Sequence, residues 1–449
     1  MFVSTRSGLE VRDVTAILQG IAPDGGLFVC PEIEPIDVPS LLNLSYTEMA
    51  EKIMSHLLPG FTDVIPTAVA AYPVKFDDPE ITPVRPVGDK FVLELWHGPT
   101  SAFKDLALTI LPYLVSAAKD MEGVQENVSI LTATSGDTGK AALEGFHDVP
   151  GTDITVFFPD GGVSDTQRLQ MVTQEGGNVR VFAVRGNFDD CQRGVKEAFA
   201  ANQGKKYLSS ANSINIGRLV PQVVYYFYAY AKVGHGEERD FVVPTGNFGD
   251  ILAGYLAKKM GLPIGKLICA SNANNVLYDF LNTGVYDRRR PFLKTASPSM
   301  DILVSSNLER LLYYASGCDC AAVAAMMKQL NEEGCYSVSD AVLAEIRKDF
   351  SAAFCSEDSC LETIGRVWKE YGYLMDTHTA VAFANAPAGS IVLSTASPFK
   401  FSDAVSKAIG MNLADTGVKM PANLANLDKR PVLHTDVINT EEIVRVALS

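Results

Sequence analysis

From about residue 90 onward, short apolar runs alternate with segments of helical periodicity, and this alternation is the feature that most constrains the fold. Runs rich in Val, Ile, Leu and Phe, followed by turns with Gly, Asn or Asp, predict buried strands. The expected strands cover residues 91–95, 128–133, 154–158, 179–184, 241–243, 266–270 and 390–393. Strand, turn and helix repeated in this order favour parallel sheets with helices on both faces. The predicted class is therefore α/β.

The length of 449 residues predicts two or three packed units rather than a single core. Residues 1–82 contain helical segments and turns before the first strong strand, and we expect them to form an N-terminal domain. Residues 300–370 are mostly helical in pattern, with 321–330 and 339–354 as the clearest helices. We interpret this region as a variable insert.

Charge and composition exclude several classes of partner. The formal net charge is −15 and the only basic run is Arg288-Arg289-Arg290, so we expect no nucleic-acid partner. The sequence has no apolar window of 18 residues and no signal-peptide pattern, which predicts a cytoplasmic protein without a membrane span. Its eight cysteines form no Cys-x-x-Cys pair, so we expect reduced thiols and no metal site.

Lys104 is the first candidate for chemistry. It lies between the turn 98–101 and the apolar run 106–111, which places it in the first turn of a buried helix. Burial and a helix N-terminus both disfavour its positive charge, and an uncharged amine can attack a carbonyl carbon. The alternative is a surface lysine paired with Asp105.

Two further turns join a predicted strand to a predicted helix. The turn Gly246-Asn247-Phe248-Gly249-Asp250 exposes backbone amides that suit a phosphate, with Asp250 expected to cap the helix or brace the loop. The turn Thr134-Ser135-Gly136-Asp137-Thr138-Gly139 suits a carboxylate or a second phosphate, but it fails the nucleotide P-loop pattern. Each is also compatible with an ordinary turn between a strand and a helix.

Several motifs resemble those of threonine synthases. The segment from His97 to Asp105 resembles the pyridoxal-phosphate lysine segment of that family, and Pro23-Asp24-Gly25-Gly26-Leu27 resembles its amino-terminal segment. Residues 246–250 match its phosphate turn. Residues 393–401 match another family segment, with Ser397 in place of a histidine. The matches span residues 4 to about 405 and are weakest between about 285 and 370.

This resemblance implies the fold-type II architecture of pyridoxal-phosphate enzymes, as in the tryptophan synthase β chain. Two α/β subdomains with parallel-rich sheets would enclose the cofactor within residues 83–449, after the N-terminal domain. The smaller subdomain is expected over about 100–230, and the larger over about 231–449 together with 83–99. The implied reaction is a carbon–oxygen lyase step of threonine biosynthesis, in which O-phospho-L-homoserine and water give L-threonine and phosphate.

The resemblance also assigns roles to residues. Lys104 is implied as the catalytic residue that carries pyridoxal 5'-phosphate, Gly246 to Asp250 as its phosphate site, and Thr395, with Ser397 as second choice, as the neutral partner of the pyridine nitrogen. Asp137 is expected beside the ring. The implied substrate contacts are Thr134, Ser135, Gly136, Thr138 and Gly139 for the carboxylate, with Asn215 and Arg218 as further contacts. His378 is expected to be structural.

Two rival functions remain at this stage. One is another fold-type II lyase such as a serine/threonine dehydratase, which would need no site for a substrate phosphate. The other is a catalytically silent homologue that binds phosphorylated ligands. We expect the protein to be a monomer or a homodimer with a small-molecule substrate.

Overall fold

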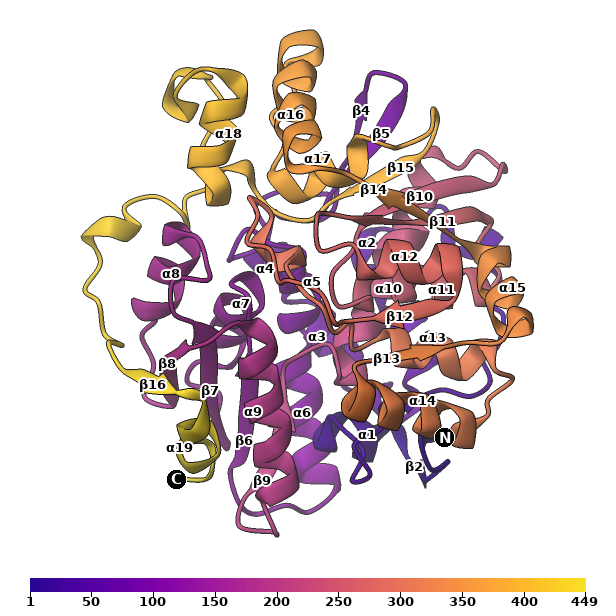
Figure 1. Ribbon diagram of the computed structural model, residues 1–449, viewed down its shortest axis with the longest axis vertical. Coiled ribbons are helices and arrows are strands. Elements are labelled where there is room, and N and C mark those ends of the chain that lie inside the picture. The colour runs from indigo at the N-terminus through magenta and orange to yellow at the C-terminus, as the bar shows by residue number, and fades with distance from the viewer.

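The computed structural model describes residues 1–449, and two sheets flanked by helices form its centre (Figure 1). The larger sheet has the strand order β14-β11-β10-β15-β5-β4, and the smaller has β16-β8-β7-β6-β9. Every strand pair in both sheets is parallel except β4 with β5. This confirms the predicted α/β class and the two parallel-rich sheets.

The predicted strands all lie in these two sheets. The larger sheet consists of β4 (Val84–Val87), β5 (Lys90–Glu94), β10 (Arg239–Pro244), β11 (Ile264–Ser271), β14 (Phe350–Phe354) and β15 (Ile391–Ser394). The smaller sheet consists of β6 (Val128–Ala133), β7 (Thr152–Pro159), β8 (Val179–Arg185), β9 (Tyr207–Ser210) and β16 (Val437–Asn439). All six residues of β6 are buried, as expected for a strand covered on both faces.

The helices that follow these strands cover both sheets. They are α5 (Lys104–Leu108), α6 (Leu111–Met121), α7 (Asp137–Phe146), α8 (Asp165–Val172), α9 (Phe188–Ala201), α10 (Ile216–Val233), α11 (Gly249–Lys259) and α12 (Val276–Thr283). Helix α10 is the central one, because only Ala231 and Lys232 of its 18 residues are not buried. It packs against α5 and α11, whose first residues form part of the site described below.

The N-terminal elements share a core with the rest of the chain. They are β1 (Phe2–Ser4), β2 (Glu10–Val11), α1 (Asp13–Gln19), β3 (Phe28–Val29), α2 (Tyr46–Leu57), α3 (Ile65–Val69) and α4 (Tyr72–Lys75). Met49 and Ile53 of α2 belong to the same hydrophobic cluster as Val223 and Val224 of α10. The N-terminal segment is therefore packed directly on the central helix.

Residues 300–370 contain α13 (Leu308–Ala315), α14 (Cys320–Glu333), β13 (Cys335–Ser337), α15 (Asp340–Asp349), β14 and α16 (Glu357–Tyr371). The prediction of one helix over 339–354 is wrong after Asp349, where β14 begins and pairs with β11. Phe350 is buried in this pairing, so sheet contacts override a locally helical pattern. The region therefore supplies an edge strand of the larger sheet and is not merely a helical insert. Strand β13 pairs separately with β12 (Val285–Asp287).

The C-terminal segment contains α17 (Thr377–Phe383) and α18 (Ser402–Ile409), and then crosses to the smaller sheet (Figure 1). There β16 pairs with β8, and α19 (Ile443–Leu448) packs against α9. The assignment of all residues 231–449 to the larger subdomain is therefore wrong for this last stretch. None of the helices combines the length and apolar character that a membrane span needs.

Candidate active site

A polar pocket lies where strands of both sheets end. In parallel sheets the carboxyl ends of the strands are the usual place for ligands. The turns after β6, β10 and β15 all contribute to it. The pocket is lined by Phe103, Lys104, Ser135, Asp137, Thr138, Asn212, Ser213, Arg218, Gln222, Pro244, Thr245, Gly246, Asn247, Phe248, Gly249, Asp250, Ser299, Met300, His378 and Thr395. Most of the site residues predicted from the sequence are thus brought together.

Lys104 is the first residue of α5, as expected, and its side chain faces Asp137. The Nζ atom lies 3.6 Å from Asp137 Oδ2 and 4.4 Å from the centre of the Phe103 ring. Burial lowers the pKa of Lys104, and Asp137 partly opposes that effect. Asp105 is not its partner, because the Asp105 carboxylate accepts hydrogen bonds from the Thr100 amide and hydroxyl. The alternative of a surface lysine paired with Asp105 is therefore wrong.

Asp137 is the centre of a buried hydrogen-bonded cluster. Its Oδ1 atom is 2.6 Å from Lys400 Nζ and accepts a hydrogen bond from Gln167 Nε2 at 2.9 Å, while Ser299 Oγ donates to Oδ2 at 3.0 Å. Burial alone would raise the pKa of Asp137, but the two lysines outweigh burial and hold this pKa well below its usual range. Asp137 is therefore a carboxylate that fixes the lysine amines around it.

Three members of this cluster were missing from the predicted site: Lys400, Gln167 and Ser299. Lys400 is 1% exposed and also donates to the Thr100 carbonyl. A lysine inside the apolar stretch Pro398–Phe401 was the available signal, because a buried ammonium needs a partner. Gln167 and Ser299 had no comparable signal in the sequence.

The turn after β10 presents free amides to the pocket. The backbone N–H groups of Gly246, Asn247 and Phe248 donate to no acceptor within the protein. Phe248 caps α11 in the left-handed conformation, with φ of 64°, and a Cβ on Gly246 would lie 2.9 Å from the Ser299 carbonyl oxygen. Consecutive amides at a helix N-terminus form an anion site.

This turn is braced from two sides. Tyr225 and Tyr226 of α10 donate hydrogen bonds to Asp250 Oδ1 at 2.5 and 3.0 Å. Burial raises the pKa of Asp250 to about 6, although the tyrosine hydrogen bonds act in the opposite direction. Behind the turn, Ser305 Oγ donates to the Gly246 backbone carbonyl at 2.6 Å. The backbone N–H of Asn307 donates to the backbone carbonyl of Asn247 at 3.0 Å.

Arg218 is a buried cation without a carboxylate partner. It is 2% exposed, its Nη1 atom donates to the Ala211 carbonyl, and its Nε atom has no partner. Burial lowers its pKa to about 10. Because an unpaired buried guanidinium is costly, this arrangement favours an anion in the pocket.

The turn after β6 divides the predicted substrate residues into two groups. Ser135 and Thr138 line the pocket. Thr134 instead accepts hydrogen bonds from the amides of Gly136 and Gly139 and shapes the turn. Gly136 has φ of 132°, and a Cβ there would lie within 2.4 Å of Gln167, so the turn requires glycine.

Asn215 lies outside the pocket, which departs from its predicted role. It caps α10, and its Nδ2 atom donates to the carbonyls of Ile17 and Ser210. Its side chain is therefore fully used in joining α1 to the start of α10.

Thr395 is placed in the pocket wall, whereas Ser397 is buried behind it. The Thr395 carbonyl accepts from the Phe103 amide at 2.9 Å, which fixes it beside Lys104. Ser397 Oγ caps the following turn.

His378 lines the pocket but has both ring nitrogens engaged, with Asp376 Oδ1 at 3.1 Å and the Ser299 backbone amide at 3.2 Å. It is structural, as expected.

The residues of the pocket suit pyridoxal 5'-phosphate. Three free amides suit its phosphate, Lys104 suits its aldehyde, and the Thr395 hydroxyl suits a ring nitrogen. The free space between these groups is about 70 Å³, below the roughly 300–1,000 Å³ of typical ligand pockets. The walls of this space come from both sheets.

Comparisons with known proteins agree with this chemistry. A family model described as "Pyridoxal-phosphate dependent enzyme" matches residues 86–394. Models described as "Threonine synthase N terminus" and "Threonine synthase, C-terminal" match residues 1–68 and 378–447. Threonine synthase of Pseudomonas aeruginosa is 40% identical, with 96% of this chain and 94% of the relative covered. The chain belongs to the threonine synthase family.

Two further relatives support this membership. The crystal structure of pyridoxal-phosphate-bound threonine synthase from Brucella melitensis superposes with a TM-score of 0.88 at 39% identity, covering 100% of this chain and 98% of that chain. Human threonine synthase-like 1 is 38% identical, with 93% of this chain and 61% of the relative covered. The predicted fold-type II architecture, the cofactor and the lyase class are thus confirmed.

Proposed function

We propose that this threonine synthase converts O-phospho-L-homoserine and water to L-threonine and phosphate in the pocket around Lys104. The observation that supports this most is one pocket that combines a buried amine, free turn amides and the unpaired Arg218. Free amides and Arg218 together offer two anion sites beside one lysine. The hydroxyls of Ser135 and Thr138 in the same pocket offer a third. A substrate with a carboxylate at one end and a phosphate at the other needs two anion sites besides the one for the cofactor phosphate.

Each pocket wall has a proposed role toward the cofactor. Residues 246–250 would hold its phosphate, Lys104 would bind it covalently, and the Thr395 hydroxyl would meet the pyridine nitrogen without protonating it. Asp137 would lie beside the ring with Lys400. When bound, the cofactor supplies an electron sink for the negative charge that develops at the substrate Cα.

The protein's own groups position the substrate and move protons. Ser135 and Thr138 would bind the α-carboxylate, and Arg218 would bind the substrate phosphate bidentately. The lowered pKa of Lys104 increases the fraction of its amine that is unprotonated at neutral pH, so the amine is suited to remove the proton from Cα. Binding at both ends of the substrate orients that C–H bond toward Nζ.

Release of phosphate from O-phospho-L-homoserine tests the proposal. The wild-type protein should turn this substrate over at least about a hundredfold more efficiently than homoserine, because losing one charge-assisted contact costs about 3 kcal/mol. Lys104→Ala should lower turnover by several orders of magnitude, as loss of a covalent catalyst does. Lys407→Ala, at an exposed position on α18, is the matched control and should leave turnover unchanged.

The same assay distinguishes the rival functions. Turnover of serine or threonine without phosphate release would indicate a dehydratase, and cofactor binding without any turnover would indicate a silent homologue. Borohydride reduction followed by peptide mass spectrometry should place the cofactor on Lys104. Label on another lysine would refute the assignment.

We also propose a cytoplasmic location and a monomer or homodimer. All eight cysteines are free thiols, as suits a reducing compartment. Cell fractionation tests the location, and light scattering during gel filtration tests the oligomeric state.

A further inference from the structure

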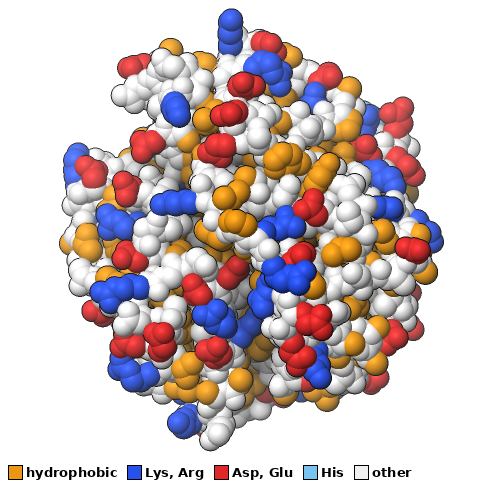
Figure 2. Space-filling view, in the orientation of Figure 1, with side chains coloured by type: hydrophobic (Ala, Val, Ile, Leu, Met, Phe, Trp, Pro, Cys, Tyr) orange, Lys and Arg blue, Asp and Glu red, His pale blue; other side chains and the backbone are white.

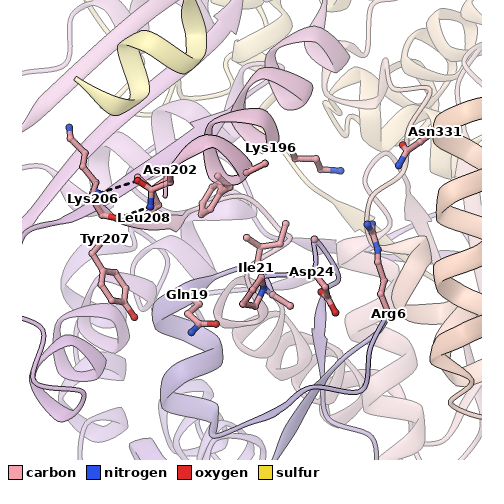
Figure 3. Close-up of a pocket in the computed structure, with 15 residues that line it drawn as sticks. Arg6, Gln19, Ile21, Asp24, Lys196, Asn202, Lys206, Tyr207, Leu208 and Asn331 are labelled. Carbon is pink, nitrogen blue, oxygen red and sulfur yellow. Dashed lines mark hydrogen bonds between the residues drawn. The ribbon is translucent and has the colours of Figure 1, made fainter. Parts of the chain in front are cut away.

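A second cavity, of about 520 Å³, lies apart from the active site and shares no lining residue with it. Its walls come from the N-terminal segment, α9, β9 and α14, which are far apart in sequence (Figure 3). Its volume is within the range of small-molecule sites.

The cavity has unpaired polar groups on one side. Lys196 Nζ has no hydrogen-bond acceptor or ion-pair partner, and burial lowers its pKa. Arg6 binds Glu309 through Nε and Nη2 and leaves Nη1 without an acceptor. Figure 3 shows Lys196, Arg6 and Asn331 converging on this side. Lys196 Nζ and Arg6 Nη1 are therefore neighbouring donors without an acceptor in the protein.

The local charge is opposite to that of the whole chain. Three basic residues and one acidic residue line the cavity, and Glu309 lies behind it on Arg6, a balance of +1, whereas the chain carries −15. The acidic residue, Asp24, already accepts hydrogen bonds from Ser4 Oγ and the Gly26 amide. Basic side chains also gather near a hollow in the lower half of the face drawn in Figure 2. The cavity therefore favours an anion.

The other side of the cavity is apolar, with Ile21, Phe199 and Leu208 among its lining residues. We propose that this cavity binds a small organic anion, with a carboxylate or phosphate head at Lys196 and Arg6 and an apolar body against these side chains. The site is independent of the reaction at Lys104.

The cavity is connected to the cofactor turn through one short segment. Glu309 binds Arg6 and is two residues from Asn307. The backbone N–H of Asn307 donates to the backbone carbonyl of Asn247 in the cofactor turn. Ser305 at the start of the same segment donates to the Gly246 carbonyl. This segment therefore lies between the cavity and the turn 246–250.

Calorimetric titration of the holoenzyme tests the site. Phenyl phosphate and benzoate probe the two kinds of anionic head on an apolar body. Phenol and inorganic phosphate probe the apolar half and the anionic half of phenyl phosphate separately. Phenyl phosphate or benzoate should bind with one saturable site, and more tightly than either half. Lys196→Met should weaken binding at least about tenfold, as expected for loss of a charge-assisted contact.

Two further variants separate the cavity from other anion sites. Ala200→Trp should block the cavity sterically, and Lys205→Met, an exposed lysine outside the lining, should bind like wild type. Turnover without the probe should be unchanged in all three variants, since none touches the active site. Unchanged affinity in Lys196→Met and Ala200→Trp would refute the site, as would the absence of saturable binding of both probes to wild type.

Discussion

Replacing Asp137 by asparagine removes one charge from the centre of the active site and keeps the shape of the side chain. The amide oxygen can accept from Lys400 and Gln167, as Oδ1 does, and the amide nitrogen can donate to Ser299 Oγ. The hydrogen bonds are thus preserved. The change isolates the electrostatic interaction between Asp137 and the two lysines.

The expected loss of stability follows from the burial of the pair. The side chains of Lys400 and Asp137 are 0% and 2% exposed, and removing one partner of a buried ion pair typically costs about 3–5 kcal/mol. The loss should therefore be about 3–5 kcal/mol at pH 7.

The sign of the pH dependence distinguishes this mechanism from simple loss of packing. Because the pKa of Asp137 is depressed in the folded protein, its stabilising contribution is fully present above its unfolded pKa of about 4. The loss caused by Asp137→Asn should therefore be about 1 kcal/mol smaller at pH 3 than at pH 7, because part of the contribution of Asp137 is already lost at pH 3.

Urea unfolding of the apoprotein, followed by circular dichroism at pH 7 and pH 3, measures both the loss and its pH dependence. Asp160→Asn is the matched control, since Asp160 is exposed and its side chain makes no hydrogen bond. A loss below about 1 kcal/mol at pH 7, or an equal loss at both pH values, would refute the reasoning.

Three further variants test the pocket walls. Gly249→Val should weaken cofactor retention, measured by dialysis, because even a Cβ there lies 3.2 Å from Ser213; unchanged affinity would move the phosphate site elsewhere. The free energy of unfolding of Asp250→Asn should rise by up to about 3 kcal/mol relative to that of the wild-type apoprotein between pH 4 and pH 7. The reason is that the raised pKa of about 6 makes the wild-type carboxylate increasingly unfavourable as pH rises. A difference between the two proteins that does not change with pH in urea unfolding would contradict this. Thr395→Asp should protonate the cofactor ring and shift its visible spectrum, and an identical spectrum would argue against contact with the nitrogen.

Much of the site was predictable because its residues lie in turns at the ends of recognisable strands. Residues 134–139 follow β6, 246–250 follow β10, and Thr395 follows β15. Within one sheet the carboxyl ends of parallel strands meet at one edge, so the α/β pattern places residues 246–250 near Thr395. Residues 134–139 follow a strand of the smaller sheet and reach this place because the two sheets pack together. The strands themselves were predictable because buried parallel strands are nearly continuous apolar runs.

The remaining parts depend on contacts that are distant in the sequence. Gln167 and Ser299 reach Asp137 from positions 30 and 162 residues away, and no local pattern indicates which polar residue will do so. Asn215 resembled a ligand contact, but its position at the start of α10 turns its amide toward Ile17 and Ser210. Phe350 was predicted to be helical from its local pattern. Its segment is a strand because it pairs with β11, and no local propensity indicates that pairing.

The distribution of charge explains how an acidic protein could act on the doubly anionic substrate proposed for it. The active site gathers three cations, Lys104, Arg218 and Lys400, near two carboxyl groups, Asp137 and Asp250. Salt screens the interaction between the ligand and surface charges that lie more than about 8 Å away. The buried groups of the pocket instead act at contact distance, in a medium of low dielectric constant. The net charge of −15 therefore has little bearing on ligand binding within the pocket. The cavity at Lys196 follows the same principle, which is why its excess of cations indicates an anionic ligand.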